Sequence, residues 1–182
     1  IGLAISTYLC WLLASLKLVP FTYLSCLFVL LTTALAGYVI YRKQDFFGVI
    51  RQNFRTMLSE ECIFLGTLIL WGYIRSLNPQ ILGLEKFMDF GFINSILNSR
   101  YMPPADPWFS GHPINYYYFG HFMYAWLTRL TGTYPAIAYN LSISTIFAFT
   151  FTMAYSFTAN LVFIRQDIYA KYHRIAGIIS AI

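Results

Sequence analysis

The sequence predicts an all-α fold, a polytopic bundle of transmembrane helices. Hydrophobic residues make up 58% of the 182 positions and charged residues only 10%, whereas soluble domains carry about 25% charged residues. So few charges do not cover the surface of a soluble domain of this length. The charges are also gathered between uncharged runs, several of which approach the ~20 residues that a helix needs to cross a bilayer.

The first two runs precede any acidic residue. Residues 1–16 carry no charge, and Lys17 to Pro20 interrupt the pattern. Residues 21–41 are again uncharged and long enough for a spanning helix at about 1.5 Å rise per residue. We therefore expect a first helix that could span with a few more preceding residues, a break before Phe21 and a complete span after it.

A basic segment follows at 42–61, and we expect it to be a cytoplasmic loop by the positive-inside rule. Its charged residues are Arg42, Lys43, Asp45, Arg51, Arg55, Glu60 and Glu61. Residues 57–74 are apolar apart from the two glutamates, which we interpret as solvated groups where the next spanning helix leaves the cytoplasmic face.

The segment 76–113 is rich in Pro, Gly and Asn, and its charges nearly balance. We predict that it is the main extracytoplasmic loop. Apolar side chains recur within it every four residues, at Leu84, Met88, Phe92 and Ile96. This spacing predicts a juxtamembrane amphipathic helix over 84–98 that lies along the membrane surface.

The rest of the chain leaves the topology open. Residues 116–130 are a poor span, interrupted by His121 and Arg129, whereas 130–164 are uncharged and contain a turn signal at 131–135. A second basic segment covers 165–174. If both basic segments are cytoplasmic, an even number of spans separates them. Either 116–130 enters the interface without crossing, which we favour, or the second basic segment is outside.

Three carboxylates in the 76–113 loop are candidates for chemistry. Glu85 and Asp89 are four residues apart and share one face of a helix, where two carboxylates can act as a general base and its partner or bind a cation. Asp106 lies between prolines that restrict its backbone, so we expect its carboxylate to be presented stiffly. We predict that the three converge on one cavity at the outer membrane boundary.

The surrounding histidines and tyrosines are further candidates. His112 and His121 add weak metal-ligand potential to the aspartates, and Asp106 with His112 is the pair to test for a metal. Tyr116, Tyr117 and Tyr118 are typical of an aromatic belt at the membrane boundary. Three consecutive tyrosines cover more than one helix face, so at least one points into protein, with nearby Asp or His residues as candidate partners.

Three motifs together resemble the signature of the uncharacterised "YYY" membrane protein family. They are Glu-Lys-Phe-Met-Asp-Phe-Gly-Phe-Ile-Asn at 85–94, Pro-Pro-x-Asp-Pro-Trp-x-x-Gly at 103–111 and Ile-Asn-Tyr-Tyr-Tyr-Phe-Gly-His at 114–121. That family is similar in layout to the GT-C glycosyltransferases, which carry an acidic motif on a juxtamembrane helix of the first extracytoplasmic loop. This chain has Gly-His-Pro-Ile-Asn-Tyr where those enzymes have a His-Pro-Pro-Leu or Pro-Pro-Leu motif.

The resemblance implies transfer of a sugar from a polyprenyl-phosphate donor to an acceptor on the extracytoplasmic face. Asp89 or Glu85 would deprotonate the acceptor. Asp106, with His112, would position the acceptor or a divalent cation, and Lys86 or Arg100 would hold the donor phosphate. Tyr116, Tyr117, Tyr118 and His121 complete the expected substrate-binding set.

We expect residues 1–182 to form a single transmembrane domain, the N-terminal part of a longer multi-pass protein of the plasma membrane. The lipid bilayer is its expected surrounding, with other membrane subunits as further partners. A net charge of +5 does not predict nucleic-acid binding, because the basic residues form short clusters and no stripe. The alternative function is a non-catalytic subunit of a larger assembly. A transporter is less favoured, because residues 18–41 and 130–164 contain no Asp, Glu, Lys or Arg.

Overall fold

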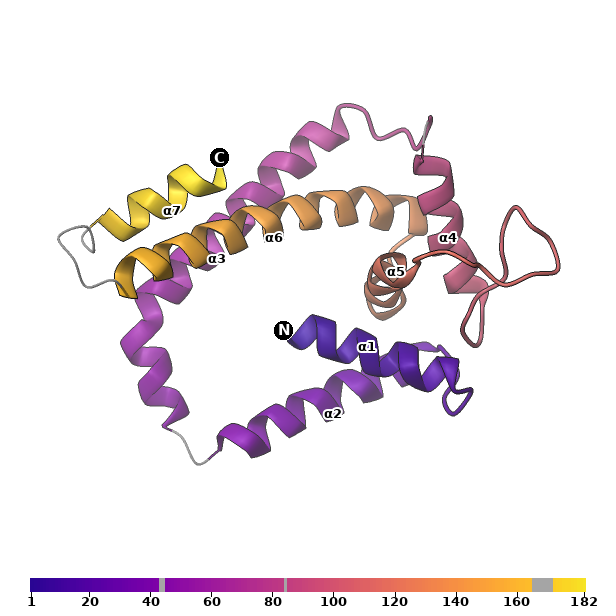
Figure 1. The fold of residues 1–182 in the computed structure, drawn as a ribbon, viewed down its shortest axis with the longest axis horizontal. Helices are drawn as coiled ribbons and strands as arrows, with labels where there is room; N and C mark the ends of the chain where they lie inside the picture. Colours follow the sequence, from indigo (N-terminus) through magenta and orange to yellow (C-terminus); the bar gives the residue numbers. More distant parts are fainter. Residues whose placement is uncertain (43–44, 84, 165–171) are drawn as a thin grey trace. The chain divides into compact units, whose positions relative to one another are not determined.

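The computed structural model describes residues 1–42, 45–83, 85–164 and 172–182, and the regular structure in these ranges is helical (Figure 1). This confirms the predicted all-α fold. The helices are α1 (Gly2–Ser15), α2 (Tyr23–Tyr41), α3 (Phe46–Ser76), α4 (Lys86–Asn98), α5 (Phe119–Thr131), α6 (Pro135–Ile164) and α7 (His173–Ala181). The chain forms two compact units, the first from residues 1–45 and 80–139, the second from residues 46–79 and 140–182.

In the first unit, α1 and α2 pack against each other and are separated where the sequence predicts a break. Lys17 has a φ of 58°, a left-handed conformation that ends the helical path. Thr22 then caps α2, its hydroxyl accepting a hydrogen bond from the Ser25 amide at 3.3 Å. The 19 residues of α2 are long and apolar enough to cross a membrane, as expected for 21–41.

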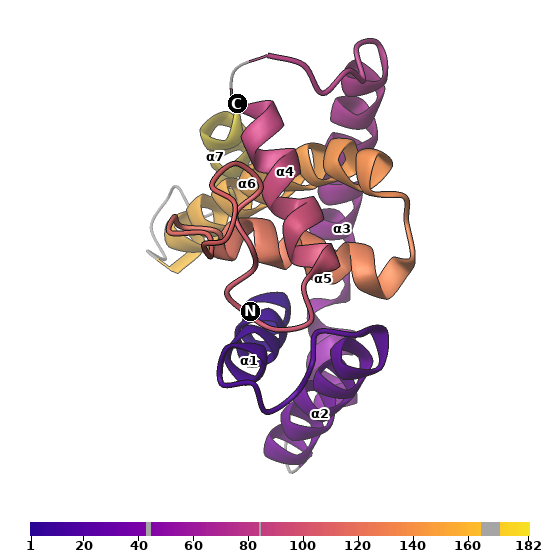
Figure 2. The same ribbon diagram turned by 90° about the vertical axis from the view of Figure 1, so that its right-hand side faces the viewer.

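The helix predicted over 84–98 is present as α4, which packs mainly on α5 (Figure 2). Phe92 and Ile96, two of the four periodic positions, are buried, whereas Leu84 lies outside the described residues. The guanidinium of Arg129, in the last turn of α5, donates to the carbonyl of Leu97 and lies 4.8 Å from the ring centre of Phe21. Arg129 therefore satisfies a free carbonyl at the C-terminal end of α4. The position of α4 along a membrane surface stays a prediction.

The turn predicted at 131–135 separates α5 from α6. Gly132 closes α5 with a φ of 66°, a left-handed conformation that favours glycine. Pro135 starts α6, where the missing N–H of proline costs no helical hydrogen bond. At 13 residues α5 is only about 20 Å long. Among the described residues, the helices long and apolar enough to span a membrane are α2, α3 and α6.

In the second unit, α3 corrects the prediction of a cytoplasmic loop over 42–61. The helix runs without interruption for 31 residues from Phe46 to Ser76 and is about 46 Å long. The segment is polar but contains no proline after position 46, and its Arg, Gln, Leu, Met and Glu residues favour helix. The two glutamates are therefore not at a helix terminus. Glu60 lies well inside one.

Helices α3 and α6 lie side by side and antiparallel in the second unit (Figure 1). Contacts join the beginning of one helix to the end of the other in regular succession, through Glu60–Ser156, Phe64–Phe149, Gly72–Ser144 and Pro79–Asn140. The N-terminal end of α3 and the C-terminal end of α6 are consequently at the same end of the unit. Arg51 and Arg55 of the first basic segment lie on α3 toward that end. Whether 116–130 crosses the membrane stays open. Residues 165–171 lie outside the described residues.

Candidate functional site

An acid–histidine pair joins α4 to α5. His121 Nε2 lies 3.0 Å from Asp89 Oδ1, and the two residues are 32 positions apart in the sequence. The side chain of Asp89 is 34% exposed and that of His121 is 18% exposed. Asp89 is thus the member of the pair that water and ligands reach, and His121 holds it from the protein side.

The ring of His121 is fixed by its surroundings. The edge of Phe92 packs against it at a centroid distance of 5.4 Å and an interplanar angle of 89°. Its Nδ1 is buried without a hydrogen-bond partner among the described residues. Asp89 is the one polar contact of the imidazole in the part of the chain that the structure describes, so the ring orients the carboxylate.

Two of the three consecutive tyrosines form an exposed pair beside these acids. The rings of Tyr116 and Tyr117 stack at 3.9 Å, and their hydroxyls are 2.5 Å apart. The hydrogen bond to Tyr117 raises the pKa of Tyr116 to about 12, with smaller contributions from the negative charges of Glu85 and Asp89. Both predicted acids therefore act electrostatically on Tyr116.

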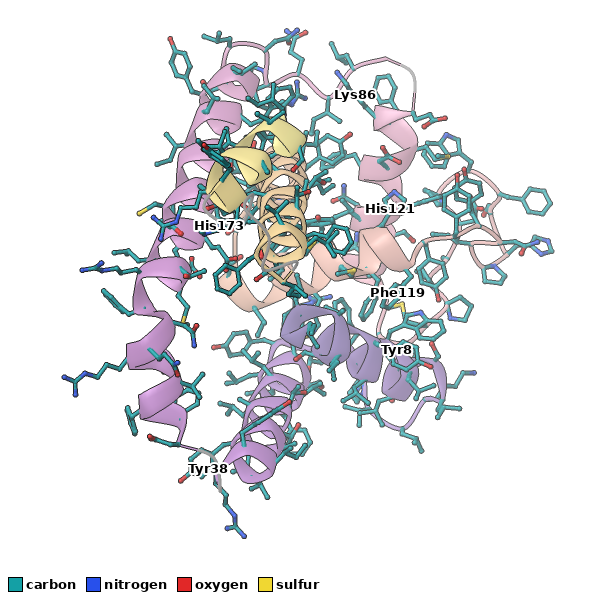
Figure 3. All side chains as sticks on the ribbon, turned by 60° about the vertical axis from the view of Figure 1, so that its left-hand side comes forward. Tyr8, Tyr38, Lys86, Phe119, His121 and His173 are labelled. Atoms are coloured by element: carbon teal, nitrogen blue, oxygen red, sulfur yellow. The ribbon has the colours of Figure 1, made fainter. Side chains whose placement is uncertain are left out.

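Tyr118 is the tyrosine that points into protein. Its hydroxyl accepts a hydrogen bond from Trp11 Nε1 at 3.0 Å. Tyr8 and Phe119 pack beside this contact, with ring centroids 6.3 Å apart (Figure 3). The expectation that one tyrosine is directed inward is correct. The expected Asp or His partner is wrong, because Tyr118 faces α1, and no sequence pattern gives the register of α1 against α5.

The carboxylate of Asp106 organises the loop that contains it. Its Oδ1 accepts hydrogen bonds from the backbone amides of Trp108 at 2.8 Å and Phe109 at 2.9 Å. These two amides hold the pKa of Asp106 below its ordinary value, Phe109 contributing most. We expected a rigidly held carboxylate that is available to a ligand. The Asp106 carboxylate is held, but its Oδ1 accepts hydrogen bonds from its own loop, as in an Asx turn.

A groove of about 540 Å³ lies between this loop and α4. Its walls are mostly aromatic, and the lining residues are Phe87, Met88, Phe92, Asp106, Trp108, Phe109, Asn115 and Tyr116. Asp106 is the one acid that lines it. Glu85 and Asp89 do not line the groove, although they lie on the same helix as Met88 and act on Tyr116. The groove thus holds Asp106, and Glu85 and Asp89 lie on the adjoining helix close enough to act on Tyr116, which lines it. Convergence of the three acids on one cavity stays a prediction.

The remaining predicted residues lie around this region. Lys86 begins α4 (Figure 3), and Arg100 follows its end. His112 is exposed and stacks on Phe109 at 4.5 Å. In the described ranges, no group of three or more His, Cys, Asp or Glu side chains is arranged to hold a metal ion. The pairing of Asp89 with His121 was not predicted, since nothing in the sequence indicates which residue of α5 faces α4.

These features define a class, an all-helical membrane protein with an acid–histidine pair on the segment between two helices long and apolar enough to span a membrane. The chain belongs to the family described as uncharacterized membrane protein (DUF2298), whose sequence profile matches residues 5–182. No curated protein and no solved structure matches the chain.

Proposed function

We propose that this protein is a membrane glycosyltransferase that moves a sugar from a polyprenyl-phosphate donor to an acceptor on the extracytoplasmic face. The Asp89–His121 pair carries the proposal. It is a partly exposed carboxylate held by a partly buried imidazole, next to an aromatic groove, on the segment between two candidate spans. The resemblance in layout to GT-C enzymes, with Glu85 and Asp89 at the position of their acidic motif, supports the same assignment.

In the proposed reaction Asp89 is the general base. The acceptor hydroxyl attacks the anomeric carbon of the sugar, a new C–O bond forms, and the bond from that carbon to the phosphate oxygen breaks. The acceptor proton passes to the Asp89 carboxylate and the electron pair leaves with polyprenyl phosphate. His121 positions the carboxylate, since it is the one hydrogen-bond partner of the Asp89 side chain among the described residues.

The other groups have supporting roles in this proposal. The groove offers aromatic faces at Trp108 and Tyr116 for the sugar, and Asp106 fixes the loop that supplies Trp108. Lys86 or Arg100, which stand at opposite ends of α4, supplies positive charge for the donor phosphate. A divalent cation would have to take ligands from the donor as well as from Asp106 or His112.

The test is release of labelled sugar from short-chain polyprenyl-phosphate hexoses, with mannose and glucose donors assayed separately, in membranes that contain the whole protein. Asp89→Asn should lower release at least 100-fold, because the amide cannot take the proton. The matched control is Glu61→Gln, an acid on α3 in the second unit. Equal release by the Asp89→Asn variant and the unaltered protein, at equal amounts of folded protein, would refute the proposal.

A non-catalytic subunit is the second candidate, favoured by the exposure of Trp108 (59%) and Phe109 (64%) on the groove loop. Exposed aromatic groups of this kind also form protein interfaces. Replacing Trp108 and Phe109 by Ala should then dissociate an assembly that native electrophoresis detects. If instead the assembly persists and sugar release falls, the transferase is supported.

A further inference from the structure

A second polar site lies in the second unit, around Glu60. The hydroxyl of Ser156 on α6 donates to Glu60 Oε1 at 2.6 Å, and Asn160 donates to the Ser156 hydroxyl at 3.3 Å. Glu60 lies about 24 Å along α3 from its end at Ser76, which is most of a ~30 Å hydrocarbon core. A carboxylate at this depth is costly in lipid and marks a functional site when its partners are incomplete.

A pocket of about 170 Å³ opens beside Glu60, and α3, α6 and α7 all contribute to its lining. The charged groups are Glu60 and Arg174, and Phe163 and Tyr155 supply aromatic walls. Helix α7 is held on α6 by close contact, since a Cβ at Gly177 would lie 2.7 Å from the Tyr155 ring. The Ser180 hydroxyl also donates to the Ala154 carbonyl at 3.3 Å. The pocket is therefore built by packed helices.

The two opposite charges face one pocket without pairing. In the described part of the chain the one ion pair is Asp89–His121, so no nitrogen of Arg174 lies within 4.0 Å of a Glu60 carboxylate oxygen. Ser156 occupies Oε1 of Glu60 and leaves Oε2 for another donor. Separated charges of this kind fit a ligand that itself carries a negative and a positive group a short distance apart.

We infer that this pocket binds the headgroup of a phospholipid that carries a phosphate and a primary ammonium, an ethanolamine-type headgroup. The phosphate binds Arg174 by charge-assisted hydrogen bonds, and the ammonium donates to Glu60. Phe163 and Tyr155 contact the glycerol and the first methylene groups. A choline headgroup has the same charges but no N–H donor, so Glu60 distinguishes the two lipids.

The depth of the pocket agrees with this ligand. It lies beside the middle of α3 and near the C-terminal end of α6, and Glu60 is about 24 Å, most of a hydrocarbon thickness, from the end of α3 at Ser76. Basic pockets between spanning helices on the cytoplasmic side are known lipid-headgroup sites. The acidic member of this pocket makes a purely anionic lipid a poorer match than a zwitterionic one.

Native mass spectrometry of the whole protein, with added phosphatidylethanolamine, phosphatidylcholine or phosphatidylglycerol, tests the inference. The unaltered protein should retain phosphatidylethanolamine about tenfold better than phosphatidylcholine, the effect expected from one charge-assisted hydrogen bond. Glu60→Gln should abolish this preference. Arg174→Gln should weaken retention of both zwitterionic lipids, and Glu61→Gln, which lines no part of this pocket, should change neither.

Three results would overturn the inference. They are equal retention of ethanolamine and choline lipids by the unaltered protein, an unchanged preference in Glu60→Gln, and strongest retention of phosphatidylglycerol. Circular dichroism of each variant establishes that the helices are intact. Where Glu60→Gln proves unstable, Glu60→Asp serves instead. It keeps the negative charge but draws the carboxylate back by one methylene group, so the preference should weaken, and an unchanged preference would count against the inference.

Discussion

The imidazole of His121 and the carboxylate of Asp89 form a hydrogen bond between Nε2 and Oδ1 at 3.0 Å, which is an ion pair only when the ring is protonated. The other ring nitrogen of His121 is buried and has no partner there. An ionised carboxylate only accepts hydrogen bonds, so the contact with Asp89 requires a proton on Nε2. In the neutral ring, Nδ1 then has a buried lone pair without a donor, which costs less than a buried N–H without an acceptor.

The neutral form of His121 should therefore carry its proton on Nε2. Nitrogen-15 shifts of histidine-labelled protein give the tautomer directly, with His121→Gln used to assign the signal. A signal from the Nδ1–H tautomer would mean that the pair with Asp89 is not formed. Asp89→Asn should leave the free energy of unfolding within about 1 kcal/mol, because the amide oxygen still accepts from Nε2.

Gly91→Ala should displace Trp108 from the groove. A Cβ at Gly91 would lie 2.7 Å from Cη2 of Trp108, and the half-exposed indole is free to swing away. Alanine also favours helix by about 1 kcal/mol, so unfolding should not become easier. Trp108 quenching by acrylamide, measured with Trp11, Trp71 and Trp126 replaced by Phe, should increase. Gly66→Ala, with no atom within 4 Å of the new Cβ, is the control.

Acid should loosen the loop around Asp106. The folded pKa of Asp106 lies below its unfolded value, so its stabilising effect is complete above the ordinary value of 3.8 and is lost as pH falls through the lower, folded pKa. The amide signals of Trp108 and Phe109 should shift together in this range. Asp106→Asn should remove the transition, and shifts that persist in that variant would assign it to another group.

The orientation of the chain can be tested by cysteine labelling. Arg51→Cys near the start of α3 should be protected from an impermeant reagent outside the cell, and Ser99→Cys after α4 should react, by the positive-inside rule. Cys10, Cys26 and Cys62 are replaced by Ser or Ala for this experiment. The reverse pattern would invert the topology and place the Asp89 site on the inner face.

Local signals in the sequence predict most of the helices. The uncharged run 21–41, the four-residue period from Met88 to Ile96 and the Gly132–Pro135 turn each act through neighbouring residues, and each has its counterpart in the structure. The prediction of a loop over 42–61 is wrong for 46–61. Charged residues beside a span are compatible with a helix as well as with a loop, and nothing in 46–61 breaks a helix.

The site was less predictable than the helices for a physical reason. Acids in one loop are visible in a sequence, and Glu85, Asp89 and Asp106 do lie around one region. Their partners come from elsewhere, as His121 does for Asp89 and Trp11 for Tyr118. Which faces of two helices meet depends on packing over the whole unit, and a single sequence contains no direct record of it.

The contact between Glu60 and Ser156 sets an order for biosynthesis. The two residues are 96 positions apart, and at about 5–20 residues per second the ribosome needs roughly 5–20 s to supply the second after the first. Helix α3 is thus made before its hydrogen-bond donor exists, and the predicted topology requires that 77–134 be translocated in the interval. During insertion the carboxylate of Glu60 depends on water, protonation or the translocation machinery until α6 arrives to close the helical hairpin.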